Sequence, residues 1–177
     1  MNDIDQDLLA FQAAQQARPD AESWLAAFET ALAARDPARI ASLFHADSHW
    51  RDVLAFTWHI TPVAGPAAIA DRLATEQART QASGFHLPPD RRAPRQVKRL
   101  GIPSIEAIFA FTTADGQGAG LVRLSPDAAD GGVMKAWLLS TTLDQLAGHE
   151  EKIGANRPTG PAYSRNFGGD NWADVRR

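Results

Sequence analysis

The sequence contains no cysteine, which excludes disulfide bonds, thiolate catalysis and sulfur-ligated metal sites. No apolar stretch approaches the roughly 20 residues that span a bilayer. No basic region precedes an apolar run at the N-terminus, so a signal peptide is not predicted either. Positive charge is not in excess: the formal net charge is -3, which gives the whole chain no general attraction for nucleic acid. We therefore expect a cytoplasmic protein with no nucleic-acid or membrane partner.

Large apolar side chains are plentiful in this chain of 177 residues. Hydrophobic residues make up 44% and charged residues 22%, with five tryptophans and eight phenylalanines, which is enough for one well-packed core. We expect an N-terminal helix or arm over residues 1–19, one domain over 20–147 and an extended tail or linker over 148–177. The aromatic residues predicted to anchor that tail to the surface are Tyr163, Phe167 and Trp172.

The first part of the chain has the periodicity of helices. Apolar spacing over residues 1–18 predicts a short helix that ends before Pro19, because the residue before a proline disfavours helical geometry. Asp20 is then placed to cap a second helix, in which Trp24 and Phe28 share one apolar face. Two later helices are predicted to begin at Asp36-Pro37 and at Gly65-Pro66.

Strand-like patterns dominate the second part. Residues 48–60 favour β structure, and residues 96–100 indicate an edge strand. Three apolar runs follow, with Asp115-Gly116 as a hairpin signal between the first two: 105–113, 119–124 and 133–142. Helices first and adjacent antiparallel strands afterwards predict an α+β fold, in which about three helices cover one face of a curved, mainly antiparallel sheet.

The run DPARIASLFHADSHWRDVLAFTWHITPVAGPAAIADRL, residues 36–73, resembles the nuclear transport factor 2-like superfamily. That superfamily includes ketosteroid isomerases, scytalone dehydratase-like proteins and small polyketide cyclases. The order of elements is similar over about residues 20–145. The resemblance implies a cone-shaped pocket for a small apolar organic ligand and a homodimer packed through the sheet.

Three phrases resemble a more specific group: HWRDVLAFTW, AWLLSTTLDQLAGHEEKIGANRP and YSRNFGGDNWADVRR. They are similar to the leader domain found ahead of the FAD-binding domain in bacterial and fungal flavin-containing monooxygenase-like proteins. The resemblance implies an accessory domain and, in longer relatives, a covalently following FAD-binding domain. This chain has no G-x-G-x-x-G fingerprint, since its glycine-rich run 116–120 is predicted to be a hairpin. We expect no cofactor in this chain.

Asp52 is the first candidate for a catalytic residue. In an extended segment over residues 48–60 it alternates in phase with Trp50, Phe56 and Trp58, so its carboxylate is predicted to face the apolar side of the sheet. A partly desolvated carboxylate is a stronger base than an exposed one. The resemblance to ketosteroid isomerases implies the role of general base for Asp52.

The rest of the isomerase machinery is missing. Phe28 stands at the position of the family's first-helix tyrosine, and Val122 lies on the strand that bears the protonated acid partner. Neither side chain can donate a hydrogen bond to an oxyanion. The alternative for Asp52 is a structural carboxylate that pairs with an arginine such as Arg51 or Arg123.

Large apolar side chains would form the walls of the implied pocket. The expected ligand-binding residues are Trp24, Phe28, Trp50, Phe56, Trp58, Phe109 and Trp137. Aromatic residues at such spacing are equally what a plain core needs. A hollow filled by bulky side chains would favour a third interpretation, an interaction module without a pocket.

Two polar clusters have both a structural and a functional interpretation. His45 and His49 have the spacing of a helical zinc pair, but the helix is predicted to end near His45, so no metal site is expected. A basic stretch is predicted to be a solvated edge or, alternatively, to dock an acidic partner or the phosphates of a cofactor held by another domain. It comprises Arg91, Arg92, Arg95, Lys98 and Arg99.

Two functions follow from these patterns. The first is a non-catalytic or accessory domain that binds a small hydrophobic ligand and forms a homodimer. The alternative is a free-standing isomerase, dehydratase or polyketide cyclase-like enzyme in which Asp52 removes a proton from a carbonyl-containing substrate.

Overall fold

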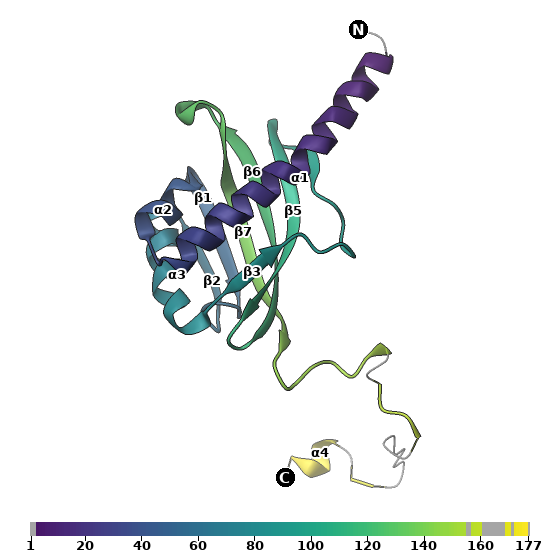
Figure 1. Ribbon diagram of the computed structural model, residues 1–177. Coiled ribbons are helices and arrows are strands. Elements are labelled where there is room, and N and C mark those ends of the chain that lie inside the picture. The colour runs from purple at the N-terminus through teal and green to yellow at the C-terminus, as the bar shows by residue number, and fades with distance from the viewer. Residues whose placement is uncertain (1–2, 155–156, 161–168, 171, 177) are drawn as a thin grey trace.

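The computed structural model describes residues 3–154, 157–160, 169–170 and 172–176. One curved sheet carries helices on one face (Figure 1). The strands are β1 (Phe44–Val53), β2 (Ile60–Ala64), β3 (Ser83–His86), β4 (Arg95–Arg99), β5 (Ile102–Thr113), β6 (Gly116–Asp127) and β7 (Val133–Leu146). The helices of the domain are α1 (Asp3–Ala33), α2 (Pro37–Ser42) and α3 (Pro66–Thr80), and a short α4 (Trp172–Val175) lies in the tail.

The sheet has the strand order β2-β1-β7-β6-β5-β3, and β4 also pairs with β5. All neighbouring strands are antiparallel except β1 and β7, which are parallel. The three apolar runs predicted as a meander are β5, β6 and β7, and the predicted edge strand is β4. The α+β fold with a mainly antiparallel sheet is therefore confirmed. The short strand β3 and the parallel pairing of β1 were not predicted.

The first helix is longer than the sequence predicts. α1 is continuous from Asp3 to Ala33 with Pro19 inside it, so the predicted break and the capping role of Asp20 are wrong. Two side-chain contacts span the proline: Gln16 donates to Asp20 at 2.9 Å, and Arg18 donates to Glu22 at 3.0 Å. The buried face also runs through this point without interruption, from Ala17 and Ala21 to Trp24 and Phe28. We infer that packing of this face offsets the hydrogen bond that proline removes.

The two later helix starts are as predicted. Asp36 caps α2, because its side chain accepts hydrogen bonds from the backbone N–H groups of Ala38 and Arg39. α3 begins at Pro66 after Gly65, whose φ of 84° suits glycine. It ends before Gln81, which adopts a left-handed conformation. These caps place α2 and α3 beside α1 against the sheet (Figure 1).

Aromatic rings occupy the space between the helices and the sheet. Trp24 and Phe28 of α1 stack with ring centroids 4.9 Å apart, and Phe28 meets Phe85 of β3 edge-on at 5.4 Å. Phe85 stacks in turn on Phe111 of β5 at 4.9 Å. Further ring contacts extend this series to Phe109, Phe56 and Trp50. All seven side chains are at most 8% exposed, so they form the core.

Two glycines of β6 make room for these rings. Gly118 pairs with Phe111 across the strands, and Gly120 pairs with Phe109. A Cβ atom at either position would overlap the facing ring. The glycine-rich run 116–120 is therefore the start of a hairpin strand, as predicted, and its glycines serve core packing.

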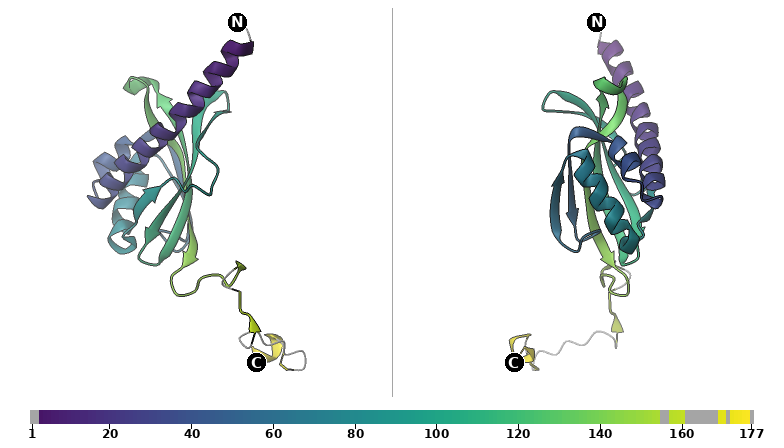
Figure 2. Two further views of the ribbon diagram at one scale, coloured as in Figure 1. Left: turned by 45° about the vertical axis from the view of Figure 1, so that its right-hand side comes forward. Right: turned by 90° about the vertical axis from the view of Figure 1, so that its left-hand side faces the viewer.

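The opposite face of the sheet is not covered by the helices, which lie together on the other side (Figure 2). After β7 the described part of the tail leads away from the domain (Figure 1). Tyr163 and Phe167, two of its predicted anchors, lie outside the described residues, and Trp172 begins α4. Across the described residues, no helix is both long and apolar enough to cross a membrane.

Candidate functional site

Asp52 is fully buried on β1, and its carboxylate accepts four hydrogen bonds. Oδ2 accepts from the backbone N–H of Phe56 at 3.0 Å, and from the backbone N–H and the hydroxyl of Thr57, both at 2.8 Å. Oδ1 accepts from the hydroxyl of Thr141 on β7 at 2.7 Å. A carboxylate presents about four acceptor positions. Oδ2 is thus bonded three times and Oδ1 once, and the full burial of the residue keeps both oxygens from solvent.

Thr141 also connects Asp52 to the aromatic core. The indole N–H of Trp50 donates to Thr141 Oγ1 at 3.0 Å, while the threonine hydroxyl donates to Asp52. The hydrogen-bond partners of Asp52 are amide and hydroxyl groups, so the pairing with Arg51 or Arg123 that the sequence left open is not found among the described contacts. The carboxylate is thus held by uncharged donors from β7 and from the loop after β1.

The segment after Asp52 is a tight loop, where the sequence predicted a strand that continues to Ile60. β1 ends at Val53, and the backbone N–H of Leu54 donates to the carbonyl oxygen of His59 at 3.2 Å. The prediction was wrong because the alternation of apolar and polar side chains carries no information on backbone hydrogen bonds that turn the chain. The acceptor that turns the chain is the Asp52 carboxylate, which captures two backbone N–H groups of the loop.

Backbone geometry in this loop changes where its aromatic residues lie. Leu54 and Trp58 have positive φ values of 67° and 55°, a region that bulky residues seldom adopt. Phe56 reaches the core, but Trp58 is 42% exposed. The predicted in-phase alternation of Trp50, Phe56 and Trp58 therefore fails beyond Val53.

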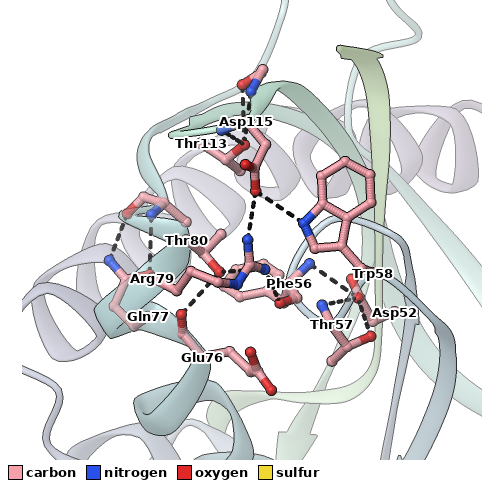
Figure 3. A network of polar contacts seen from close by, with 12 residues as sticks. Asp52, Phe56, Thr57, Trp58, Glu76, Gln77, Arg79, Thr80, Thr113 and Asp115 are labelled. Atoms are coloured by element: carbon pink, nitrogen blue, oxygen red, sulfur yellow. Dashed lines mark hydrogen bonds and ion pairs between the residues drawn. The ribbon is translucent and has the colours of Figure 1, made fainter. Parts of the chain in front are cut away.

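An ion pair ties the loop to two other elements (Figure 3). Arg79 in the last turn of α3 contacts Asp115 in the β5–β6 turn at 2.6 Å, and its guanidinium also donates to the carbonyl oxygen of Phe56. The indole N–H of Trp58 donates to the same Asp115 carboxylate at 3.3 Å. The loop, the helix and the hairpin are consequently joined at one end of the sheet.

The seven residues predicted to line a ligand pocket are divided between two environments. Five of them are packed against other rings of the core: Trp24, Phe28, Trp50, Phe56 and Phe109. Trp58 lies on the exposed loop, and Trp137 is the half-buried extra residue where the β6–β7 register shifts. Val122, like Phe28, is fully buried and apolar. The roles of these residues and of Asp52 in binding or catalysis stay predictions.

A groove of about 390 Å³ lies on the sheet face that the helices leave uncovered. Residues in neighbouring register on three strands line it: His49 and Arg51 on β1, Pro62 and Ala64 on β2, and Leu138 and Ser140 on β7. Its volume falls within the roughly 300 to 1,000 Å³ of small-molecule sites. Among the described residues Arg51 has no ion-pair partner. The groove therefore combines apolar walls with one unneutralised cation.

The basic stretch is organised around Glu106 of β5. Arg95, Arg99 and Arg123 each contact its carboxylate at 2.8 Å, and Glu106 is only 7% exposed. Burial acts to raise the pKa of this carboxyl, but the hydrogen bonds from Arg99, Arg123 and Arg95 outweigh it and lower the pKa from 4.5 to about 2. Arg95 and Arg99 of the basic stretch thus have an internal partner that neither sequence interpretation included, and docking of an acidic partner stays a prediction.

Acid should weaken the fold through this carboxylate. Because the folded-state pKa of Glu106 lies below the ordinary 4.5, its contribution is present above about pH 4.5 and is lost as the pH falls toward about 2. We expect the free energy of unfolding to fall over this interval by about 2 kcal/mol more in the wild type than in Glu106→Gln. Urea unfolding measured across the interval checks this, and a difference between the two proteins that stays constant with pH would contradict it.

The two histidines of the H-x-x-x-H pattern lie in different surroundings. Both lie on β1, not on a helix. His45 Nε2 is 2.9 Å from the hydroxyl oxygen of Ser125, whereas His49 lines the groove. In the described part of the chain no group of three or more metal-ligating side chains is found.

Sequence patterns missed several polar residues of these sites. Thr141 was assigned to an apolar strand, although its hydroxyl contacts Asp52 across 89 positions of sequence. Arg79 was not singled out, Asp115 was assigned only to a turn, and Glu106 lay unnoticed inside an apolar run. One available signal was the isolated charge of Glu106 in a strand of otherwise apolar and small residues, which predicts a buried partner.

Comparisons with known proteins give a fold but no family. No protein-family model matches the sequence, and no curated protein matches it. Among solved structures, an NTF2-like protein with a cystatin-like fold from Novosphingobium aromaticivorans is 16% identical, with a TM-score of 0.53 over 84% of this chain and 96% of that one. ActVI-ORFA from Streptomyces coelicolor is also 16% identical, with a TM-score of 0.50 over 71% of this chain and 96% of that one.

Proposed function

Starting from the nuclear transport factor 2-like fold of this chain, we propose that it is a small ligand-binding domain whose ligand site is the groove between β2, β1 and β7. The observation that supports this site is the groove itself, about 390 Å³ with largely apolar walls. The hollow beneath the helices is less suitable, because stacked aromatic rings occupy it. A ligand there would have to displace core side chains.

The lining residues favour a particular class of ligand. Leu138, Pro62 and Ala64 offer contact to a flat or branched apolar body. Arg51 at the groove can pair with a carboxylate or another acidic group on that body, since it has no described partner within the protein. We therefore propose an apolar organic molecule that carries one acidic group.

Two dyes that differ by one charge test this assignment. Anilinonaphthalene sulfonate and its uncharged analogue phenylnaphthylamine both fluoresce when an apolar site takes them up. We expect both to bind the wild type, and Arg51→Gln to weaken the sulfonate roughly fivefold, as an exposed ion pair of about 1 kcal/mol requires. Binding of the uncharged dye should change little, because the apolar walls remain.

A pair of variants on one strand locates the site. Leu138→Asp puts a charge in the groove and should abolish uptake of both dyes, while Thr142→Asp, on β7 outside the groove, should not. Equal effects of the two variants, or an Arg51→Gln variant that weakens both dyes alike, would remove the groove as the ligand site. Thermal unfolding of each variant verifies that the fold is retained.

Assembly and context are further parts of the proposal. The resemblances noted in the sequence support a homodimer packed through the sheet and an accessory role beside a flavin-dependent domain in longer relatives. Half-buried apolar residues such as Leu121 and Leu138 lie on strands of the uncovered face, where a second copy could pack. Sedimentation of the wild type and of Leu138→Asp therefore accompanies the dye measurements. The comparisons with known proteins carry no sign of the flavin link.

No specific observation favours the enzyme alternative. A general base must come within hydrogen-bond reach of the proton it removes, but Asp52 is fully buried and its carboxylate is bonded to Phe56, Thr57 and Thr141. We therefore assign Asp52 to the support of the loop and retain the ligand-binding function as the proposal.

A further inference from the structure

Four arginines gather around one carboxylate at the edge of the sheet. Three of them bind Glu106 directly, and Arg92 lines a small groove of about 160 Å³ together with Arg95 and Glu106. Arg92 has no described ion pair, nor has Lys98 on β4. One negative charge therefore faces several positive ones, in a chain whose net charge is -3.

The ion pairs leave most of the donor capacity of this cluster unused. Each guanidinium has five N–H donors, and the bonds to Glu106 use one from Arg95, two from Arg99 and one from Arg123. The same three side chains are 46%, 38% and 29% exposed. Glu106 thus fixes the arginines in place, while their remaining donors face solvent and can meet carboxylates from outside.

The position of β4 favours an extended partner. The backbones of Arg95 and Arg99 lie at the two ends of β4, and both guanidinium groups turn toward the same Glu106 carboxylate. Among the described strands β4 is bonded to β5 alone, so it lies at the edge of the sheet. An extended segment can pair with the edge of β4 and bring its carboxylates to the arginine donors beside that strand, whereas a single small anion would use only the donors. Nucleic acid fits less well, because the acidic net charge repels a long polyanion.

We propose that β4 and the arginines around Glu106 form a docking surface for an acidic polypeptide segment of a partner protein. This surface is separate from the proposed ligand groove, which lies on β2, β1 and β7. The positive edge repels the same edge of a second copy and selects an acidic partner, so it combines protection from self-association with recognition.

A labelled peptide tests the proposal directly. Fluorescence anisotropy at low salt compares a short fluorescein-labelled peptide of alternating Glu and Ser with the same peptide carrying Gln in place of Glu. The wild type should bind the Glu peptide alone, with an affinity that falls as salt is added. The double variant Arg92→Gln, Lys98→Gln leaves every contact of Glu106 in place and should weaken binding about tenfold.

A matched double variant controls for the loss of charge. Arg35→Gln with Lys152→Gln removes one arginine and one lysine from exposed positions away from β4 and should leave binding within about twofold. Equal weakening by both double variants would overturn the proposal, as would equal binding of the Gln and Glu peptides or no binding at all. Tighter binding of a single-stranded oligonucleotide than of the Glu peptide would assign the surface to nucleic acid instead.

Discussion

Gly120→Ala is expected to lower the free energy of unfolding by about 3 kcal/mol or more, the upper range for overpacking a core. The added Cβ would overlap the ring of Phe109 and lie 2.5 Å from the carbonyl oxygen of Ser140 on the neighbouring strand. A ring can shift, but a backbone carbonyl within a sheet cannot move without breaking the ladder. Thermal unfolding should therefore show a drop of roughly 10 °C for a chain of this length.

Gly118 offers the matched comparison. The three atoms nearest to a Cβ at this position all belong to the ring of Phe111, so Gly118→Ala should be partly rescued by Phe111→Leu. Gly120→Ala should not be rescued to the same degree by Phe109→Leu, because the Ser140 carbonyl remains in the way. Double-mutant cycles measure both couplings. A melting temperature of Gly120→Ala within about 2 °C of the wild type would show that the rings do not fill the hollow as described.

Removal of the Asp52 carboxylate has the second large expected effect. Asp52→Ala removes the acceptor of two backbone N–H groups and of the Thr141 hydroxyl, each of which costs about 1 to 3 kcal/mol when unsatisfied, whereas the Thr57 hydroxyl can still donate to the carbonyl oxygen of His59. Relaxation of the loop will recover part of this, so we expect a loss of about 3 to 5 kcal/mol in urea unfolding. Asp52→Asn keeps the shape but presents an amide N–H₂ to groups that donate, and should cost about 2 kcal/mol.

Amide hydrogen exchange gives a local readout of the same change. The backbone N–H groups of Phe56 and Thr57 should lose protection in Asp52→Asn, since they donate to the carboxylate. Asp47→Asn is the control, an exposed aspartate on the same strand without a described partner, and should change stability by less than about 0.5 kcal/mol. A stability of Asp52→Asn equal to or above that of the wild type would instead point to a strained functional acid.

Local signals predicted the elements whose ends are fixed by neighbours in sequence. The Asp36 cap with Pro37, the start of α3 after Gly65 and the hairpin at Asp115 all depend on contacts within a few residues. The break at Pro19 was wrong because the cost of a proline inside a helix is local, whereas the packing that offsets it involves the whole buried face of α1. Propensity rules do not include that tertiary contribution.

In the candidate sites, too, features set by local sequence were predictable and contacts between distant parts of the chain were not. The inward position of Asp52 was predictable from alternation on β1, and it is buried as expected. Its partner Thr141 was not, because only the parallel pairing of β1 with β7 brings the two together. The groove likewise depends on the register of three strands. The family resemblance implied a pocket, and seven aromatic residues were assigned to its walls, yet the sequence holds no information on whether rings of that size fill the hollow or line it.

The location of the ligand is measured most directly by following backbone amide resonances during titration with anilinonaphthalene sulfonate. If the uncovered face of the sheet holds the site, the shifts will concentrate at His49, Arg51, Ala64 and Leu138, around the groove. Shifts concentrated instead at Phe28, Phe85 and Phe109, with those four amides unchanged, would place the ligand among the core rings and contradict the account.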